Sequence, residues 1–565
     1  MNKPFILSLT AASILSSNLN AESMYERFET MEMQMRQMQE EITTLRAQQV
    51  ESAAKDLERI EESSNLEEYD EDDLEAEDDL EAEDDAELTD DADADEDDED
   101  DEDEMNVEEE IIDIQESITD LNIATNGSHL KFSVDYRFSL DNLQYKMADR
   151  SKSKNDAFMT NRFWLNMNWK ATDNLSFTGQ MAYNKHFGAR SGVTAENSGF
   201  EIFDWITNEN AYDGEIRIRS LYFLYKNDTF LTADIPWTFS IGRRPSTNGH
   251  LVNLRDDDQA SSPMGHTINV EFDGMSSKFS FDNLTGIDGM YIKLCAGRGL
   301  TNALPKFNAQ QTPYATDDNS VNDIDLVGLI FVPYNDGQYG IATEYYYANN
   351  LIDVQVSPTG IPTGDFNKVG GLHSFTANFT MNGIGDEWSD YLDDTFFFLS
   401  GAVSQTDPKA DTRMLYNTYN LDGTMNPAGE SKTGYSAWVG IQMPSIISEE
   451  GKWGLEYNWG SQYWRSITYA EDTNIGSKLA TRGSAYEAYF TEPLIDDILS
   501  LQVRYTYIDY THSGSNGFFG ETSGNALAIS DIQDAAAAGN PFAARYASSI
   551  VETAQDIRFY LRYRY

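Results

Sequence analysis

A short stretch of the chain, residues 243–258, concentrates charged side chains of both signs. Two arginines open it, and a third arginine followed by three aspartates closes it. These residues are Arg243, Arg244, Arg255, Asp256, Asp257 and Asp258. Opposite charges facing each other across a narrow passage create a field that orients polar solutes and disfavours apolar ones. In the plainer alternative, the arginines pair with nearby acids, hold a loop in place and select nothing.

Residue patterns typical of enzymes are missing from the sequence. The six histidines are scattered, without a His-Glu-x-x-His pair, and neither a Gly-x-Ser-x-Gly turn nor a phosphate-binding loop is present. Cys295 is the single cysteine, which excludes an intrachain disulfide and a cysteine-based metal cluster, and we expect it to lie beside Lys293 on an inner surface. The sequence therefore predicts no enzyme and no cofactor. A hydrolase assembled from scattered Asp, Ser and His residues remains the catalytic alternative.

The last nine residues, "IRFYLRYRY", indicate which kind of structural element positions these charged residues. Apolar or aromatic residues occupy every second position, and arginines lie between them. Because successive side chains of a strand point to opposite faces, one face is apolar and the other cationic. The apolar set is Ile557, Phe559, Leu561, Tyr563 and Tyr565.

The same alternation recurs along the chain from residue 130 onward. "LKFSVDYRFSL" (130–140) keeps it for eleven residues, and "WGLEYNWGSQY" (453–463) is similar. Strands of about ten residues match the nine to eleven needed to cross a bilayer at a tilt. About sixteen such segments occur, near residues 130, 161, 175, 215, 237, 266, 289, 324, 338, 371, 394, 433, 452, 484, 499 and 555.

The connections between these strands fall into two classes. Even-numbered strands are followed by short turns, as at 172–174 and 448–451, and odd-numbered strands by long loops. The long loops are 141–160, 186–214, 297–323, 405–432 and 512–554. This sorting is typical of an up-and-down antiparallel β-barrel of an outer membrane, closed by the last strand against the first. A soluble multi-domain β-sandwich is the competing architecture.

With this strand count, the charged stretch falls in the connection between strands five and six, residues 245–265. By position it corresponds to the loop that folds inward and narrows sixteen-strand pores. Other arginines alternate with apolar neighbours and are expected to point into the lumen. They are Arg137, Arg217, Arg219, Arg504, Arg558 and Arg562. The sequence thus predicts an all-β transmembrane barrel at 129–565 with a charged constriction.

The first quarter of the chain differs in composition from the rest. Residues 1–21 resemble a secretory signal peptide. The segment 22–65 has a heptad pattern that predicts a periplasmic coiled coil, or a lone amphipathic helix. Residues 66–110 form an acidic linker, with 31 Asp and Glu and no Lys or Arg within 67–110. Such a run stays extended and solvated, with divalent-cation binding as the alternative. A short amphipathic helix is expected at 111–128.

The chain has 565 residues and a net charge of −58, of which −39 lies in residues 1–129 and −19 in residues 130–565. Nothing in this acidic composition indicates a nucleic-acid partner. The expected partners are outer-membrane lipid, the barrel assembly machinery that reads a terminal aromatic residue, and small hydrophilic solutes. The coiled coil also suggests a homo-oligomer, with a trimer as the specific guess.

Two stretches carry a resemblance to a known family. "WTFSIGRRPSTNGHLVNLRDD" (237–257) and "SPMGHTINVEFDG" (262–274) resemble a family assigned to the outer membrane and called domain of unknown function 3373. The resemblance covers most of residues 120–565 and implies a Gram-negative outer-membrane barrel similar to a porin. It names no substrate. The leading hypothesis is passive diffusion of small hydrophilic solutes; the alternatives are a structural envelope protein that anchors the N-terminal region, a barrel that sheathes another protein, and an outer-membrane hydrolase.

Overall fold

The computed structural model describes most of the chain from Lys131 to Tyr565. The described ranges are 131–187, 216–244, 247–301, 323–356, 362–384, 388–416, 420–422, 424–448, 450–468, 473–514 and 526–565. Contacts divide the chain into Met1–Asp103 and Glu104–Tyr565, and all described residues belong to the second unit. The expected signal peptide, coiled coil, acidic linker and short helix (1–128) lie outside the described residues.

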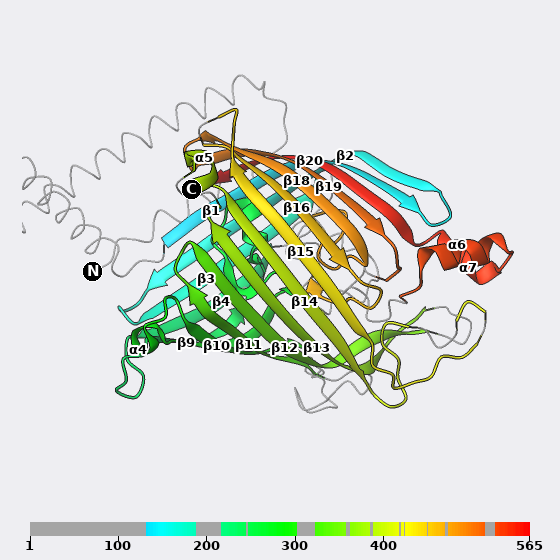
Figure 1. Ribbon diagram of the computed structural model, residues 1–565, viewed down its shortest axis with the longest axis horizontal. Helices are drawn as coiled ribbons and strands as arrows, with labels where there is room; N and C mark the ends of the chain where they lie inside the picture. The colour runs from blue at the N-terminus through cyan, green and yellow to red at the C-terminus, as the bar shows by residue number, and fades with distance from the viewer. Residues whose placement is uncertain are drawn as a thin grey trace, which may run out of the picture. The chain divides into compact units, whose positions relative to one another are not determined.

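Sixteen antiparallel strands close into one barrel. In chain order they are β1 (Lys131–Met147), β2 (Lys152–Lys170), β3 (Leu175–His186), β4 (Ile216–Asn227), β5 (Trp237–Arg244), β9 (Phe272–Ser280), β10 (Tyr291–Leu300), β11 (Ile324–Asn335), β12 (Tyr339–Val356), β13 (Pro362–Asn382), β14 (Phe396–Pro408), β15 (Thr433–Pro444), β16 (Lys452–Gly460), β18 (Gly483–Ile495), β19 (Leu499–Tyr510) and β20 (Val551–Arg564). Figure 1 shows the strands running side by side at a common tilt. The predicted strand number and barrel closure are confirmed.

The last strand pairs with the first along nearly its whole length. Tyr563 lies opposite Tyr136, and Phe559 lies opposite Leu140. On β20 the odd-numbered residues face outward, so that Ile557 is 52% exposed whereas its neighbour Arg558 is 2% exposed. Closure pairs the backbone groups of both terminal strands, which a barrel in lipid requires because no water reaches them there.

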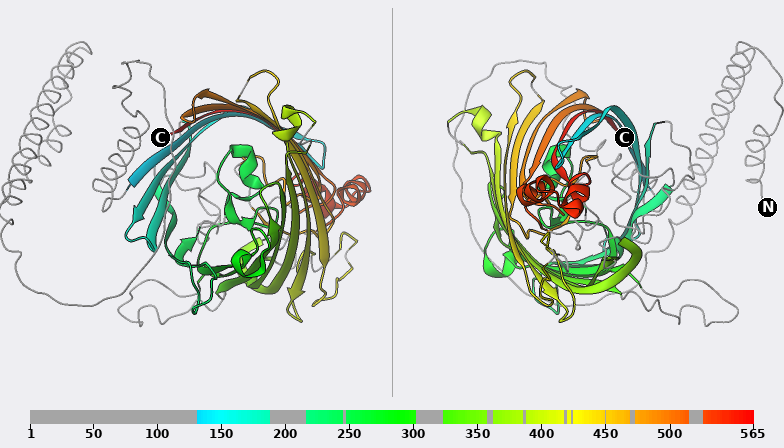
Figure 2. Two further views of the ribbon diagram at one scale, coloured as in Figure 1. Left: turned by 60° about the vertical axis from the view of Figure 1, so that its left-hand side comes forward. Right: turned by 90° about the vertical axis from the view of Figure 1, so that its right-hand side faces the viewer.

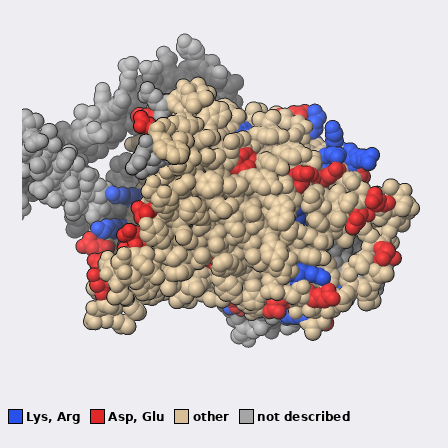
Figure 3. All heavy atoms as spheres, viewed as in Figure 1, with Lys and Arg blue, Asp and Glu red and all other residues tan. Residues whose placement is uncertain are grey.

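The outer face of the barrel is apolar and the inner face polar. β1 illustrates the division, because outward Tyr136 is 38% exposed whereas inward Arg137 and Asp141 are buried. On the face seen in Figure 3, uncharged residues form a broad band across the strands, and most charged residues lie toward its two ends. Among the described residues, no helix is both long and apolar enough to span a bilayer. A closed barrel with an apolar outer belt is the architecture of outer-membrane proteins, and the protein is located in that membrane.

The two ends of the barrel differ. The end that holds the C-terminus carries short connections, including α4 (Asp282–Thr285) and α5 (Asp390–Asp393), and the opposite end carries α6 (Ile529–Ala537) and α7 (Pro541–Ala547). The described parts of two predicted long loops, 405–432 and 512–554, lie at this second end. Most of the predicted loops 186–214 and 297–323 lies outside the described residues. The loop predicted at 141–160 is wrong, because β1 and β2 continue as a hairpin with a turn at 148–151. The β2 end of this hairpin, residues 151–157, is exposed and mostly polar, so it lacks the apolar alternation that marks a membrane strand. The β1 side packs Leu143 and Ala148 into a buried cluster with residues of α6 and α7.

The position predicted for the sixth strand is also wrong. The sixth strand of the barrel is β9, which begins at Phe272, whereas the sequence pattern indicated a strand near residue 266. Residues 266–271 belong to the connection between β5 and β9. Their apolar alternation reflects burial inside the barrel and not contact with lipid, as the next section describes.

Candidate functional site

The connection between β5 and β9 folds into the barrel. We call its described part, residues 247–271, the first inner segment. It contains β6 (Gly249–His250), η3 (Val252–Asp256), β7 (Ser261–Met264) and β8 (Ile268–Asn269), and β6 pairs with β7. Figure 2 shows this ribbon inside the ring of strands. Most of its side chains are buried.

A second connection, between β16 and β18, also lies inside. Its described residues are 461–468 and 473–482, which we call the second inner segment, and it contains β17 (Ile467–Thr468). β17 pairs in parallel with β8 of the first inner segment. Trp464 and Leu479 are buried here, and Leu479 joins an apolar cluster with Leu251 of the first inner segment and Trp438 of the wall. The two inner segments therefore support each other as well as the wall.

A buried network of charges fixes both inner segments to β16 and β18. Arg255 donates from Nη1 to Glu487 Oε1 on β18 at 3.0 Å. Lys478 of the second inner segment donates to the same Glu487 at 2.5 Å and to Glu456 on β16 at 2.6 Å. Trp438 Nε1 also donates to Glu456, at 2.9 Å. Glu487 thus receives one cation from each inner segment, which makes it the junction of the network.

The three aspartates that follow Arg255 contact the strands where the barrel closes. Asp258 accepts from Arg562 Nη2 at 2.9 Å, and Asp257 accepts from Lys452 at 2.8 Å. Asp256 accepts from the Tyr560 hydroxyl at 3.2 Å. Arg562 also donates to Asp135 on β1, at 2.5 Å. The wall of β16–β20 and β1 therefore holds the charged tip of the first inner segment.

His266 fixes the other part of the first inner segment to β14 and β15. Its Nδ1 lies 2.7 Å from Ser400 Oγ and its Nε2 lies 2.8 Å from Ser436 Oγ. The ring is fully buried between Trp438 and Trp464, with centroid separations of 5.7 and 5.6 Å. Burial lowers the pKa of His266 to about 3. The imidazole is therefore neutral at neutral pH and acts as a hydrogen-bonding bridge.

The inner face of β2–β5 is cationic. It carries arginines, and among the described inner residues of these strands no carboxylate accompanies them, since their single acid, Asp156, is exposed near the hairpin turn. The arginines are Arg162, Arg217, Arg219, Arg243 and Arg244. The guanidinium carbons of two of them, Arg162 and Arg219, lie 3.4 and 4.2 Å from the ring centroid of Trp164. Such stacking holds guanidinium groups in place against an aromatic face.

A chain of hydrogen bonds runs across this face to the first inner segment. Asn166 donates to Ser133 at 3.1 Å, Gln180 donates to Asn166 at 2.7 Å, and Arg219 donates to Gln180 at 2.6 Å. Arg219 Nε lies 3.0 Å from Glu271 Oε1, and Arg243 donates to the other oxygen of Glu271 at 3.2 Å. Glu271 thus joins two cations of the wall to the inner segment.

The structure brings most of the arginines and aspartates singled out in the sequence into one lumen. Five of the six wall arginines are buried and face inward, and Arg217 is half-buried. Arg255, Asp256 and Asp258 contact the wall of β18–β20, whereas Arg243 and Arg244 lie on β5. The predicted residues therefore form two groups, one around the tip of the first inner segment and one on β2–β5. In the second group, Arg219 and Arg243 pair with Glu271.

Sequence reasoning missed the residues that hold the inner segments. Glu487, Glu456, Lys478, His266 and Trp464 gave no signal, because their contacts form only when a connection folds into the barrel. The partner of His266, Ser436, is 170 residues away, whereas Lys478 and Glu487 are nine residues apart but belong to an inner segment and a wall strand. Their types are ordinary for a strand or loop. A buried charge on an inward strand position becomes recognisable only when its partner from an inner segment is known.

The inner surface of the described barrel carries charged and hydrogen-bonding side chains. Within the described residues, no group of three or more His, Cys, Asp or Glu side chains is placed to hold a metal ion. Many of the charged side chains instead pair with one another, as Arg255 does with Glu487 and Arg562 with Asp135. Charged and hydrogen-bonding groups of this kind are typical of interiors that contact polar solutes.

Comparisons with solved structures find outer-membrane barrels at low sequence identity. OmpT of Vibrio cholerae is 13% identical, with 77% of this chain and 97% of that chain covered and a TM-score of 0.39. OmpF of Salmonella typhi, solved in complex with daunomycin, is 12% identical, with 78% and 99% covered and a TM-score of 0.38. OprB of Pseudomonas putida is 11% identical, with 80% and 97% covered and a TM-score of 0.40. No curated protein matches this chain in sequence.

A family model matches residues 152–565, which is most of the chain and nearly all of the barrel. The match includes β2–β20 and both inner segments. The chain therefore belongs to the family described as protein of unknown function (DUF3373).

Proposed function

We propose that the protein is an outer-membrane channel through which small hydrophilic solutes diffuse passively. One observation carries the proposal: a closed barrel encloses a polar, charged lumen, and two inner segments fixed to its wall narrow that lumen. An apolar outer face is what lipid requires of the barrel, whereas a solute pathway requires a polar interior.

The charged residues of the lumen would act in two ways. Arg255, Asp256 and Asp258 hold the first inner segment through their contacts with the wall, which fits the plainer reading of these charges. The cationic face of β2–β5 would provide the field for passing solutes, with Arg217 and Arg244 among its members. Ion selectivity would therefore depend more on β2–β5 than on the tip of the inner segment.

Conductance of the purified full-length protein in planar bilayers tests the proposal. We expect discrete current steps in salt solution, and swelling of proteoliposomes in small sugars that declines as the sugar becomes larger. Heat-denatured protein at the same concentration serves as the control for leakage. Folded barrels that give neither current steps nor swelling would contradict the proposal.

A structural envelope protein is the second candidate, and one observation favours it. Apolar side chains inside the lumen, such as Leu251, Trp438 and Leu479, pack the inner segments as firmly as a protein core. A barrel filled in this way anchors other parts of the chain without conducting. Absence of current with normal assembly would support this candidate.

The homo-oligomer, with a trimer as its specific form, also stays a proposal. Its coiled coil lies outside the described residues. Cross-linking of the detergent-extracted full chain tests it, since a band at three times the monomer mass is expected and monomer alone would contradict it.

A further inference from the structure

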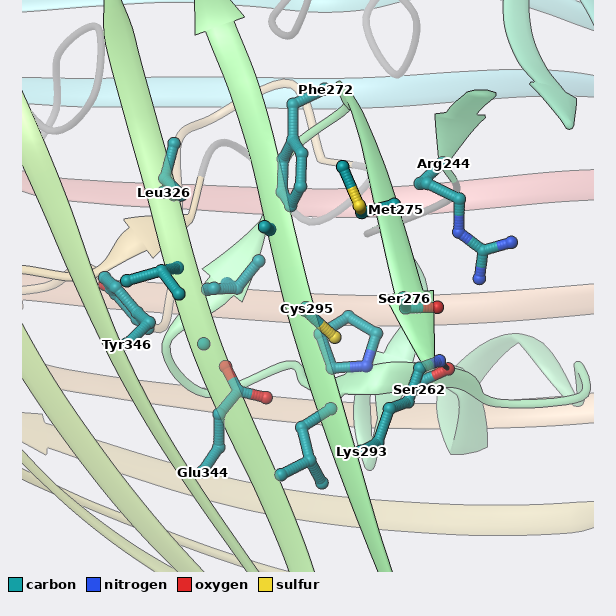
Figure 4. A pocket seen from close by; sticks show the side chains of 16 residues that line it. Arg244, Ser262, Phe272, Met275, Ser276, Lys293, Cys295, Leu326, Glu344 and Tyr346 are labelled. Atoms are coloured by element: carbon teal, nitrogen blue, oxygen red, sulfur yellow. Dashed lines mark hydrogen bonds between the residues drawn. The ribbon is translucent and has the colours of Figure 1, made fainter. Parts of the chain in front are cut away.

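A small cavity lies between the barrel wall and the first inner segment. Strands β5 and β9–β12 form its outer side and residues 262–268 its inner side, and its volume is about 50 Å³. Figure 4 shows its lining. The polar lining residues are Arg244, Ser262, Ser276, Lys293, Cys295 and Glu344. These charged lining residues do not belong to the network around Glu487.

Lys293 and Glu344 face the cavity from two strands that flank β11. Both are inward residues in register with Ile330, which separates them. They are 8% and 4% exposed, so both charges are removed from water. Both line the same cavity, yet among the described residues their hydrogen-bond partners are Ser262 and the Met264 backbone, not each other. The gap between them is available to a molecule that contacts both.

Each of the charged groups that line the cavity has hydrogen-bonding capacity that the described residues do not fully use. Glu344 accepts from the backbone N–H of Met264 through Oε2 at 2.7 Å, and its Oε1 is buried without a partner in the described structure. Lys293 donates to Ser262 Oγ, which uses one of its three N–H groups. Arg244 stacks on Tyr222 at 4.2 Å, and its buried Nη1 also has no partner among the described residues. A buried charged group without a hydrogen-bond partner is energetically unfavourable. A ligand that forms the missing hydrogen bond therefore gains affinity.

The remaining surface of the cavity is apolar. Its side chains include Ile268, Phe272, Leu326, Ile330 and Tyr346. Phe272 lies against Gly297 of β10, where an added Cβ would come within 2.3 Å of the ring. The glycine thus lets the aromatic ring close one side of the cavity. This surface accommodates a small apolar group beside the charged ones.

We propose that this cavity binds a small zwitterion of the α-amino-acid type, no larger than about glycine or alanine. Its carboxylate would contact Lys293 and Arg244, its ammonium would donate to Glu344 Oε1, and a methyl group would lie against Phe272. A cavity of this volume has room only for a ligand about as large as a few water molecules. An anion alone leaves Glu344 unmet, and a cation alone is repelled by Lys293 and Arg244. The inference rests on the proposed channel and names the solute class that it retains.

Cys295 provides the probe, because it is the only cysteine of the chain and lines the cavity. The folded full-length protein in detergent is treated with methyl methanethiosulfonate, and labelling is followed by mass spectrometry. At a ligand concentration ten times its Kd, occupancy slows labelling about tenfold. We expect this protection from glycine and alanine, less from leucine, and none from propionate or ethylamine.

Two variants separate binding from a change in folding. Glu344→Gln removes the acceptor charge and should abolish protection by alanine while Cys295 remains reactive. Glu552→Gln, on β20 and outside the cavity, makes the same chemical change and should leave protection intact. Each variant is first shown to fold by its heat-dependent gel mobility.

Three results would overturn the inference. Equal protection by propionate and alanine indicates an anion site, and labelling without protection by any compound indicates a cavity that holds water alone. Labelling only in urea indicates a cavity closed to solutes. Because labelling in detergent needs no current across a membrane, protection without conductance contradicts the channel alone, and conductance without protection contradicts the zwitterion site alone.

Discussion

Arg255 of the first inner segment and Glu487 of β18 form a fully buried ion pair, with 3.0 Å between Nη1 and Oε1. Glu487 also accepts from Lys478 and from the Thr506 hydroxyl. One wall carboxylate therefore anchors two separate connections. Neutralising this carboxylate would leave two buried cations without their counter-ion. In a simple ion pair, only one cation would lose its partner.

Replacing Glu487 by Gln should destabilise the barrel interior strongly. Breaking a buried ion pair by removing one partner costs about 3–5 kcal/mol. We expect the free energy of urea unfolding in lipid vesicles, followed by tryptophan fluorescence, to fall by about that amount. The Glu492→Gln variant, on the same strand near its turn, should lose less than about 1 kcal/mol. Equal losses in the two variants would show that Glu487 is not a special anchor.

His266 makes the attachment of the first inner segment sensitive to acid. Burial lowers its pKa to about 3, whereas a histidine in water has a pKa of about 6.5. Protonation therefore favours the detached segment, so the attachment is complete above pH 6.5. It weakens by about 1.4 kcal/mol per pH unit as the pH falls from 6.5 toward 3.

We expect channel current noise, or hydrogen exchange of residues 247–271, to rise between pH 7 and pH 4.5. His266→Asn is the control, because an amide can bond to Ser400 and Ser436 but does not titrate in this range. Carboxylates elsewhere titrate in the unaltered protein and in the variant alike. The difference between their two pH profiles therefore reports on His266 alone. Identical pH profiles would exclude His266 as the cause.

Much of the barrel could be predicted from the sequence, because lipid imposes a simple rule on each strand. Outward residues such as Phe132 and Tyr563 must be apolar, and alternation with inward residues such as Arg562 reveals the strand. The number of strands, their closure and most connections followed from this rule. The hairpin of β1 and β2 did not, because its exposed residues 151–157 are mostly polar and show no apolar alternation.

The inner segments could not be predicted in the same way. Ile268, Val270 and Phe272 alternate as in a membrane strand, but all three pack inside the barrel in one buried cluster that also contains Ile467 of β17. Apolar alternation reports burial on one face and does not say whether lipid or protein covers that face. The partners of Arg255 and His266 lie more than a hundred residues away, on strands that only the closed barrel brings near.

The cationic face of β2–β5 should influence ion selectivity. Replacing Arg217 and Arg244 by Gln removes two positive charges from the lumen. Unit charges 10 Å apart in water interact by about 0.4 kcal/mol, roughly a twofold change in relative permeability. We expect the reversal potential in a salt gradient to shift toward cations. Lys154→Gln with Lys170→Gln, at exposed positions near the ends of β2, should shift it less. No difference between the two pairs would contradict a selective role for this face.

The two faces of β20 should respond differently to substitution. Phe559 faces lipid, and an arginine there costs about 2–4 kcal/mol near the bilayer midplane. Its neighbour Tyr560 faces inward and donates to Asp256 at 3.2 Å, so Tyr560→Phe should cost about 1 kcal/mol. Refolding into vesicles, scored by heat-dependent gel mobility, should therefore fail for Phe559→Arg and succeed for Tyr560→Phe. The reverse order would mean that the assigned faces are wrong.

Tyr565 should matter for delivery to the membrane more than for the stability of the barrel. Its backbone exchanges hydrogen bonds with Val134 of β1, at 2.9 and 2.6 Å, and its side chain is 79% exposed. Tyr565→Ala keeps these backbone bonds and removes only the exposed ring. Refolding into vesicles should then match that of the unaltered protein, because the paired strand is intact. In cells, the amount of folded barrel in the outer membrane should fall if the assembly machinery reads the terminal ring. A matched loss in both assays would instead assign the ring to barrel stability, and unchanged levels in both would exclude it as an assembly signal.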